Sequence, residues 1–585
     1  MPAHISGMSD IQHIKRRYEK LQAEKQYWVY TWQLVAEYVR SRKATFTHEV
    51  QPGQFLTGHI YDSTASQSNH KMAASLIGAL YPNGSKSIEI KPHPSLKGRD
   101  LQEVKEYFDE VTKIVIRVLS SYKAGFTTSL QEYMSDQGAF GTSGIYVYAS
   151  DDKDAPVRYK AVDVRESCID EGADGFVDTW YRKFKWTVKQ VVEEYGIENV
   201  SVNTAEKFHK EQYDDMVVLL HLVEPRRFSG GHIGNKHMPY RAVHLEWEHD
   251  HKLRESGYMS MPVMVTRFWK ETGEKYGRSP AMEAMPDILE INAERQAAIL
   301  AIEKALDPPL ALFDDGTLGG GVVDTSAGAL SVFKVSGNLG KSSRKIIEQL
   351  VTTGELTSTY KHMLELQEII TQMFFIDRLT DLNNDTRMTL GEANIRNELR
   401  GQSLGSIYER QIVELFNPVI ERTIEILIEK NMLGVAYGSW QHQAALERGE
   451  DPLIIPDAVL RAMANGLDVY EINYISPAIR IMRQEELTGI TRLTEYAMNV
   501  AKVYPQILDN LNFDDMIRRV QELVGAPSSN VVSMDEVRKL RAAREQMQQQ
   551  MQQAQMQMEA TGAVKNLGAA AKHASDAGLN VGEVA

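Results

Sequence analysis

Residues 377–399 read DRLTDLNNDTRMTLGEANIRNEL, and this stretch separates two of the longest helical patterns in the chain. Its first half is rich in Asp and Asn and has almost no apolar side chain to bury. In its second half, Thr389 and Glu392 have the spacing of a capping box, in which each side chain pairs with a backbone N–H of a helix's first turn. We therefore expect a polar loop over 377–388 and a new helix from 389.

Long helices are predicted on both sides of this loop. Apolar residues from Ile346 to Phe374 recur at helical spacing and predict a helix over about 342–376. The helix that begins at 389 is expected to reach about 433, roughly 60 Å at about 1.5 Å per residue. Pro418 lies inside it, and a proline ring that clashes with the preceding turn predicts a kink there.

The segment before this pair of helices also returns to a helical pattern. Residues 280–307 keep one apolar face, Pro280 suits a first helical turn, and Asp307 and two prolines end the pattern. Residues 310–340 are Gly-rich with short β-like runs and are too few to form a domain alone. The pattern is helix, small β excursion, helix.

The first half of the chain mixes helices and strands. Helices are predicted over 9–45 and from about 62 to 80, the second capped by Asp62 or Ser63. From about 140 to 270 the segments GIYVYAS, FVDTWYRKFKW, MVVLLHLVEP, RAVHLEWE and MPVMVTRFW predict strands. A linker-like region near 434–475 leads into further helices. The fold class is α+β, mainly helical.

The composition excludes several classes of protein. The 585 residues include 65 Lys and Arg against 79 Asp and Glu, a formal net charge of −14, so a protein that clamps DNA by its phosphates is not indicated. We find no apolar run of membrane-spanning length and no secretory signal, so no membrane partner is expected. Cys168 stands alone among acidic neighbours, which favours an inert thiol.

Three motifs could be taken for active sites, and each fails on spacing. SGNLGKSS (336–343) resembles a phosphate loop, but the first glycine position of that motif is Val335. HLEWEHDHK (244–252) offers metal-type donors in no recognised ligand spacing, and a solvated hairpin explains it equally well. GTSG (141–144) lacks the pattern of a hydrolase nucleophile. We expect no catalytic residue, metal site or cofactor.

A stripe of Met547, Met551, Ala554 and Met558 follows helical spacing within a Gln-rich segment. It suits either a seam between subunits or a long solvated helix, and both interpretations stay open.

The order of these elements, with several longer stretches, resembles the portal proteins of tailed bacteriophages, the head-to-tail connector family of short-tailed phages. The stretches are TGHIYDSTASQSNHKMAASLIGALYPNG, YGRSPAMEAMPDILEIN, RMTLGEANIRNELRGQSLGSIYERQIVELFNPVIERTIEIL and YISPAIRIMRQEELTGITRL, with LDNLNFDDMIRRVQELVGAPSSNVVSMDEVRKLRAAREQ. A Met-Thr-x-x-Glu pattern is carried by Met388, Thr389 and Glu392. These are structural signatures and cover most of the chain.

The resemblance implies a ring, typically of twelve identical subunits, at one vertex of the capsid, through which double-stranded DNA is packaged and ejected. It divides the chain into regions with family names. These are the wing (1–279), a stem helix (280–307), the clip (308–341), a second stem helix (342–376), the tunnel loop (377–388), a long kinked wing helix (389–433), the crown (434–543) and a helical barrel-like extension with a tail (544–585).

Residues expected to face DNA follow from these regions. In the tunnel loop they are Arg378, Asp381, Asn383, Asn384, Asp385 and Arg387, and at the junction of clip and stem they are Lys334, Lys341, Arg344 and Lys345. The basic residues suit weak phosphate contacts, or they pair with Asp377, Asp381, Asp385 or Glu348. Twelve copies carry about −170 charges, which suits a channel that lets DNA slide.

The resemblance also implies partners. They are the terminase motor, tail adaptor proteins, the major capsid and scaffolding proteins, and internal core or ejection proteins. The protein is expected in the virion, after synthesis in the host bacterial cytoplasm. The rival interpretations are an enzyme of phage DNA metabolism or cell-wall degradation, with acidic pairs as general acid and base, and another capsid or scaffold component.

Overall fold

The structure is a computed structural model of the 585-residue chain. It describes the chain except residues 1–6, 49–52, 83–86, 95, 97–100, 227–236, 315–322, 335–346, 351–355, 378–403, 450–451, 477–478, 480–483, 525–530, 533–535, 554–568 and 570–585. The chain divides into two compact units, Met1–Met482 and Arg483–Ala585.

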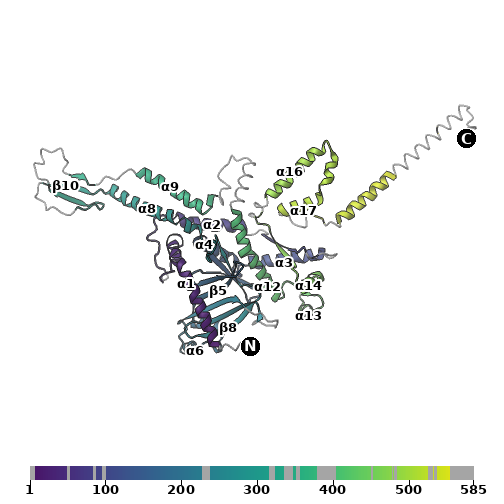
Figure 1. The fold of residues 1–585 in the computed structure, drawn as a ribbon, viewed down its shortest axis with the longest axis horizontal. Helices are drawn as coiled ribbons and strands as arrows, with labels where there is room; N and C mark the ends of the chain where they lie inside the picture. The colour runs from purple at the N-terminus through teal and green to yellow at the C-terminus, as the bar shows by residue number, and fades with distance from the viewer. Residues whose placement is uncertain are drawn as a thin grey trace, which may run out of the picture. The chain divides into compact units, whose positions relative to one another are not determined.

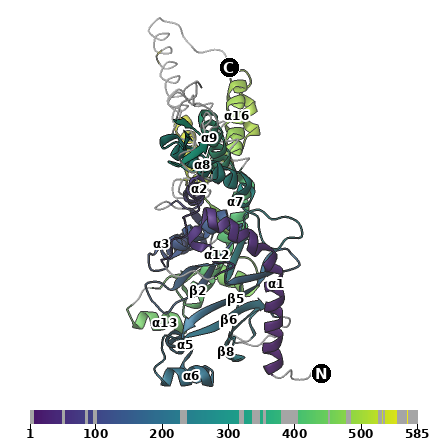
Figure 2. The ribbon, with the colours of Figure 1, turned by 90° about the vertical axis from the view of Figure 1, so that its left-hand side faces the viewer.

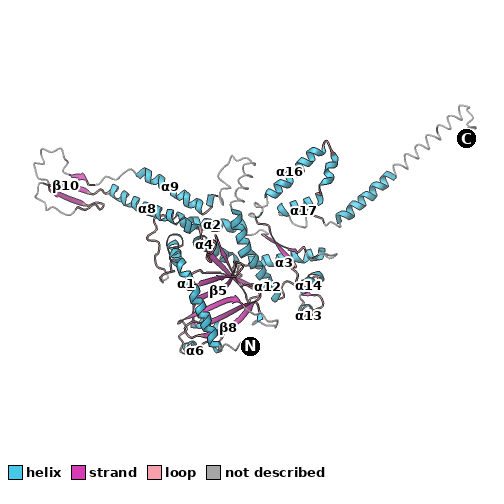
Figure 3. Ribbon diagram, in the orientation of Figure 1, coloured by secondary structure: helices cyan, strands magenta, loops and turns pink. Residues whose placement is uncertain are grey.

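Two antiparallel sheets form the centre of the first unit (Figure 3). The larger has the strand order β4-β5-β6-β7-β8 and the smaller the order β3-β2-β9. Their bounds are β2 (Thr142–Ala149), β3 (Val157–Val162), β4 (Ser167–Glu171), β5 (Val177–Thr187), β6 (Met216–Pro225), β7 (Tyr240–Glu246), β8 (His251–Tyr258) and β9 (Val263–Arg267). All five strands predicted from the sequence are present, and β3, β4 and β8 are additional.

Alternation along the strands sends side chains to two cores. Leu220 and Leu245 point to one face of the larger sheet, where Ile14 and Tyr18 of α1 (Gly7–Val39) cover them. Figure 2 shows α1 beside the strands of the larger sheet. Leu219 points to the opposite face, which α5 (Val188–Tyr195) and α6 (Val202–His209) cover.

Helices predicted at the start of the chain are confirmed. The helix expected over 9–45 is α1 with a short 3₁₀ turn at Ser41–Lys43, and α2 spans Thr64–Leu80. Asp62 provides the cap of α2, because its Oδ1 accepts a hydrogen bond of 2.8 Å from the Thr64 N–H, whereas the side chain of Ser63 makes no capping bond. The helix ends at Leu80, directly before the stretch YPNG that predicts its end.

Two helices between α2 and the sheets went unpredicted. They are α3 (Leu101–Ser120) and α4 (Phe126–Phe140). The signal for α3 was present, since Val104, Phe108 and Val111 are buried at helical spacing. A side chain at Gly138 of α4 would meet Asn69 of α2, and this glycine lets the two helices pack closely.

The helix expected over 280–307 is confirmed with one break. It consists of α7 (Pro280–Glu283) and α8 (Met285–Leu306), separated at Ala284 before a second proline, Pro286. A proline lacks the N–H that would continue the hydrogen-bond ladder, and it is tolerated in the first turn of a helix.

A three-stranded sheet follows α8, and it corrects the expected helix over 342–376. Strand β10 (Leu310–Asp314) pairs in parallel with β11 (Leu330–Lys334) and antiparallel with β12 (Ile347–Gln349). Residues 347–349 are therefore strand and not helix, because Ile347 pairs with Leu312 across the sheet. Helix α9 begins only at Leu356 and ends at Met373.

The long helix after the polar loop is described from residue 404. An α-helical segment over 404–411 continues into a π-helical turn, Ile412–Phe416, and then into α12 (Asn417–Glu429). The disturbance predicted at Pro418 thus takes the form of a wider turn just before the proline, and the helix continues through it. Thr389 and Glu392 lie outside the described residues.

A buried ion network joins this π turn to the sheets. The Arg267 side chain of β9 is only 1% exposed, and its Nη2 lies 3.0 Å from Oε1 of Glu414. The backbone N–H of Arg267 donates to Oε2 of Glu414 at 3.0 Å. On its other side the guanidinium contacts Glu171, which also pairs with Lys270. Such a network holds the π turn firmly against the sheet edge.

Residues 434–475, expected to be linker-like, are instead folded onto the first half of the chain. Strand β15 (Tyr470–Tyr474) pairs antiparallel with β1 (Ile88–Pro92), and the Tyr474 hydroxyl donates to Asn417 at 2.6 Å. The intervening elements are β13 (Val435–Ala436), α13 (Trp440–Glu447), β14 (Ile454–Ile455) and α14 (Asp457–Ala464). This region therefore belongs to the first compact unit.

The second unit is helical. Its elements are α16 (Gln484–Ala501), a 3₁₀ turn at Pro505–Asn510, α17 (Phe513–Val524) and a helical segment over 536–553 (Figure 1). Exposed ion pairs such as Arg519–Glu486 connect its helices. Met547 and Met551 are exposed, whereas Ala554 and Met558 lie outside the described residues.

Candidate functional site: the paired helices and their outlying sheet

Most residues that the sequence predicts to face DNA lie outside the described residues. This holds for Arg378, Asp381, Asn383, Asn384, Asp385, Arg387, Lys341, Arg344 and Lys345, and for the phosphate-loop-like stretch 336–343. Lys334 is the last residue of β11, where it stands opposite Asp314 of β10. The structure therefore describes the framework on both sides of the predicted loop.

This framework is a pair of helices that lie side by side, α8 and α9 (Figure 1). At about 1.5 Å per residue they extend roughly 33 Å and 27 Å. Each helix buries apolar residues on the side that faces the rest of the first unit. They are Ile288 and Ile291 on α8, and Leu366 and Ile370 on α9.

Polar contacts fix the base of the helix pair. The Asn292 side chain of α8 accepts hydrogen bonds from the N–H groups of Tyr61 and Asp62, at 2.9 and 3.1 Å. Gln367 of α9 donates to Oδ2 of the same Asp62 at 2.9 Å. The carboxylate of Asp62 thus contacts both α2 and α9, and its backbone N–H contacts α8, so this one residue connects three helices.

The outer faces of the pair carry apolar side chains that a single chain leaves in water. Leu364 on α9 is 65% exposed and Leu300 on α8 is 52% exposed. Others on these helices are Leu289, Ile299, Leu306, Tyr360, Ile369 and Met373. The sequence predicts an apolar face on α8, and the helix carries more apolar residues around its circumference than one buried stripe needs.

The three-stranded sheet of β10, β11 and β12 also exposes apolar side chains. Phe313 and Phe333 pack with their ring centres 5.8 Å apart, and Ala311 and Ser331 are buried. Leu330 and Ile347, however, are both more than half exposed. Exposed apolar patches of this kind mark surfaces that meet another molecule.

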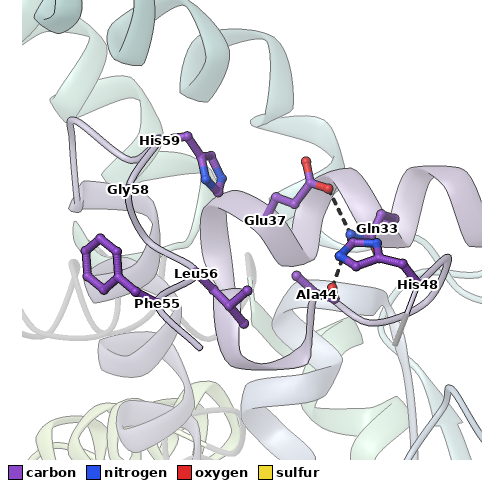
Figure 4. Close-up of a pocket in the computed structure, with 8 residues that line it drawn as sticks. All are labelled: Gln33, Glu37, Ala44, His48, Phe55, Leu56, Gly58 and His59. Carbon is purple, nitrogen blue, oxygen red and sulfur yellow. Dashed lines mark hydrogen bonds between the residues drawn. The ribbon is translucent and has the colours of Figure 1, made fainter. Parts of the chain in front are cut away.

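Two surface hollows are not catalytic in character. The first, of about 340 Å³, lies beside α1 (Figure 4). Its Gln33 donates to Glu37 and to the Ala44 carbonyl, at 2.8 and 3.2 Å, and so holds the chain as it leaves the helix. The second, of about 620 Å³, is lined by charged groups that pair with each other, including Arg278 with Glu274.

The metal-type donors of the stretch 244–252 do not converge on one point. His244 and Glu246 lie on β7, which ends at Glu246, whereas Glu248 lies in the following turn. Glu246 is fully buried and accepts hydrogen bonds from Ser201 and Thr204, which hold the start of α6. The cluster is structural.

Cys168 is buried in the core under α1, and burial raises the pKa of its thiol. The expectation of an inert thiol is supported, although burial and not the acidic neighbours is the main cause. Two buried histidines of the larger sheet, His221 and His244, contact each other with ring centres 3.9 Å apart and ring planes tilted by 60°. Burial lowers the pKa of His244 to about 3 and that of His221 well below its usual value.

Comparison with known proteins shows the family to which the chain belongs. The family model described as bacteriophage head to tail connecting protein matches residues 11–532. The chain belongs to this family. A probable portal protein of Bordetella phage BPP-1 is 25% identical over 92% of both chains, and a portal protein of Salmonella phage epsilon15 is 26% identical over 92% of this chain and 91% of its own.

Membership in the head to tail connecting proteins confirms the resemblance seen in the sequence. It makes the chain a structural protein of the phage particle, located where the head joins the tail, and it removes the rival interpretation as an enzyme. Within the described part of the chain, no helix is both long and apolar enough to cross a membrane.

Proposed function

We propose that copies of this chain assemble into a closed ring at one capsid vertex and that double-stranded DNA is packaged and ejected through its channel. In this proposal α8 and α9 form the stem and the sheet of β10, β11 and β12 forms the clip. The segment 377–388 is the tunnel loop, and the second unit contributes to the crown. Twelve subunits, the number typical of the family, is the expected size.

The exposed apolar faces of α8 and α9 carry this proposal. Fully burying one leucine is worth about 1.5–3 kcal/mol, so leaving several of them in water is unfavourable unless a neighbour covers them. Leu364 and Leu300 lie on different helices of the pair, which suits contact with two different neighbours. Two unlike surfaces that meet head to tail generate a ring when the rotation closes.

The charge of the chain supports a sliding channel. A ring of chains that each carry −14 repels phosphates over most of its surface, so DNA is not gripped. The few basic residues proposed near the channel, Arg378 and Arg387 in the loop and the lysines and arginine at 334–345, then make weak contacts that do not depend on sequence.

Membership in the family supports further partners for this ring. We infer that the clip meets tail adaptor proteins, that the outer surface meets major capsid and scaffolding proteins, and that a terminase motor docks during packaging. Hydrolysis of ATP by that separate motor agrees with the failed phosphate loop at 336–343. Internal core or ejection proteins are expected on the capsid side.

Deletion of Leu382–Asp385 tests the channel part of the proposal. We expect the variant to form rings like the natural protein and to fail in packaging or retaining DNA, as measured by nuclease-protected DNA per particle. A control variant replaces the same four residues with Gly-Ser-Gly-Ser, which keeps the length and removes the Asn and Asp side chains. If the deletion abolishes ring formation, the loop is structural and this role for it is wrong.

A further inference from the structure

Three metal-type donors meet between the two paired helices. Glu290 and Glu294 lie one turn apart on α8, and His362 lies opposite them on α9. One possible ligand atom from each residue lies within 4.8 Å of the other two. Among the described residues this is the one group of three such side chains that the fold brings together.

The carboxylate of Glu294 is incompletely satisfied at this point. Its Oε1 lies 3.0 Å from Nδ1 of His362. Its Oε2 is buried and has no hydrogen-bond partner among the described residues. A buried oxygen without a partner costs about 1–3 kcal/mol. A cation beside this oxygen removes that cost, whereas the hydrogen bond to His362 alone does not.

The donor set has a chemical preference. An imidazole with two carboxylates suits zinc and the neighbouring transition metals, whereas calcium and magnesium prefer oxygen ligands alone. Zinc bonds of about 2.0–2.1 Å place neighbouring donors about 3.4 Å apart in a tetrahedron. Glu294 and His362 already lie 3.0 Å apart, so the remaining separations need to close by at most about 1.4 Å, and Glu290 and His362 are exposed enough to move.

We propose that Glu290, Glu294 and His362 bind a zinc-class divalent cation that clamps α8 to α9. Water completes the coordination on the exposed side. The ion replaces the proton shared by His362 and Glu294 and gives the buried oxygen of Glu294 a partner. The site goes beyond the proposed channel function, because a single chain contains all three protein ligands.

Equilibrium dialysis of the metal-stripped full chain against Zn²⁺ tests this site. We expect one tightly bound ion per chain, and Co²⁺ in its place should give visible absorption bands typical of a low-symmetry site. His362→Ala and Glu294→Gln should each weaken binding about tenfold or more. Circular dichroism of each variant, with rings and monomers analysed separately, establishes that the chain is folded.

Matched controls separate this site from incidental binding. His13→Ala and Glu303→Gln remove an exposed histidine and an exposed glutamate elsewhere on helices, and they should leave Zn²⁺ affinity unchanged. The proposal is overturned if the natural chain binds no stoichiometric ion at micromolar free Zn²⁺. Equal affinity in the site variants and the natural chain overturns it as well, because another of the 16 histidines then holds the ion.

Discussion

The sheet-bearing region and the paired helices of this chain treat apolar side chains in opposite ways. In the sheets, Trp180, Tyr181 and Leu220 are completely buried, and α1, α5 and α6 cover both faces of the larger sheet. On α8 and α9, leucines such as Leu300 and Leu364 are more than half exposed. The first region buries its apolar side chains within one chain, and the second leaves apolar side chains exposed that a neighbour would cover in the proposed ring.

The two regions also differ in how they place their polar groups. The sheets contain a buried arginine, Arg267, with carboxylate partners on both sides. The paired helices have few polar contacts between them, chiefly Asn292 at the base and the pair of Glu294 with His362. If the proposed ring is correct, the subunit contacts lie on the exposed faces of α8 and α9 and the sheets serve the stability of the single chain, so mutations can address the two one at a time.

The largest expected effect lies in the sheets. Arg267→Ala removes the buried guanidinium between Glu171 and Glu414 and leaves Glu414 with the more distant Arg410, at 3.4 Å, as its remaining cation. Breaking a buried ion pair in this way costs up to about 3–5 kcal/mol. Thermal or urea unfolding of the first unit measures the loss. Arg278→Ala is the control, because Arg278 pairs with Glu274 on the surface and should cost about 0–1 kcal/mol. Equal effects of the two changes would remove the distinction.

Two residues on the same helix sharpen the comparison next. Ile370 of α9 is fully buried, so Ile370→Ala should lower the free energy of unfolding by about 2–5 kcal/mol. Leu364→Ser changes an exposed position and should alter the stability of the single chain by no more than about 0.5 kcal/mol. It should, however, reduce ring formation, which sedimentation velocity measures. Normal assembly of Leu364→Ser would exclude this face from the subunit contact.

The effect that is smallest near neutral pH is a dependence of stability on pH from the buried histidine pair. Burial lowers the pKa of His244 to about 3, whereas an unfolded histidine titrates near 6.5. Between these values the unfolded chain binds a proton that the folded chain does not. Stability is therefore unaffected above pH 6.5 and falls below it, by about 1.4 kcal/mol per pH unit for this group.

His244→Asn isolates this contribution. The variant should lose stability less steeply than the natural chain between pH 6.5 and 4.5, as measured by unfolding at a series of pH values. His13→Asn, at an exposed position on α1, should keep the natural slope. An unchanged slope in His244→Asn would show that the histidine is protonated in the fold.

Local patterns in the sequence predict much of this fold, and the exceptions have a common cause. Pro280 and the apolar spacing after it predict α8, and the aromatic and β-branched runs predict five strands. The predicted helix is wrong at Ile347 because the apolar spacing there suits a helix as well as a strand. Only the pairing of Ile347 with Leu312 decides between the two. Strand β15 was not predicted for a similar reason, since its partner β1 lies some 380 residues earlier in the chain.

Some features of the candidate site could likewise be predicted from the sequence, and others could not. The resemblance to the connector family directs attention to 377–388 because the order of elements is readable along the chain. The network of Arg267, Glu171 and Glu414 leaves no trace in the sequence, because its members are brought together only by folding. The meeting of Glu290, Glu294 and His362 is equally invisible, since the third residue comes from a different helix.

Electron microscopy of the purified full-length chain tests the central claim most directly. If the exposed faces of α8 and α9 are subunit contacts, negatively stained particles at high protein concentration are closed rings with a central hole, and Leu364→Ser particles form fewer of them. A population that remains monomeric at high concentration, or that forms shells or filaments without closed rings, would contradict the proposed portal.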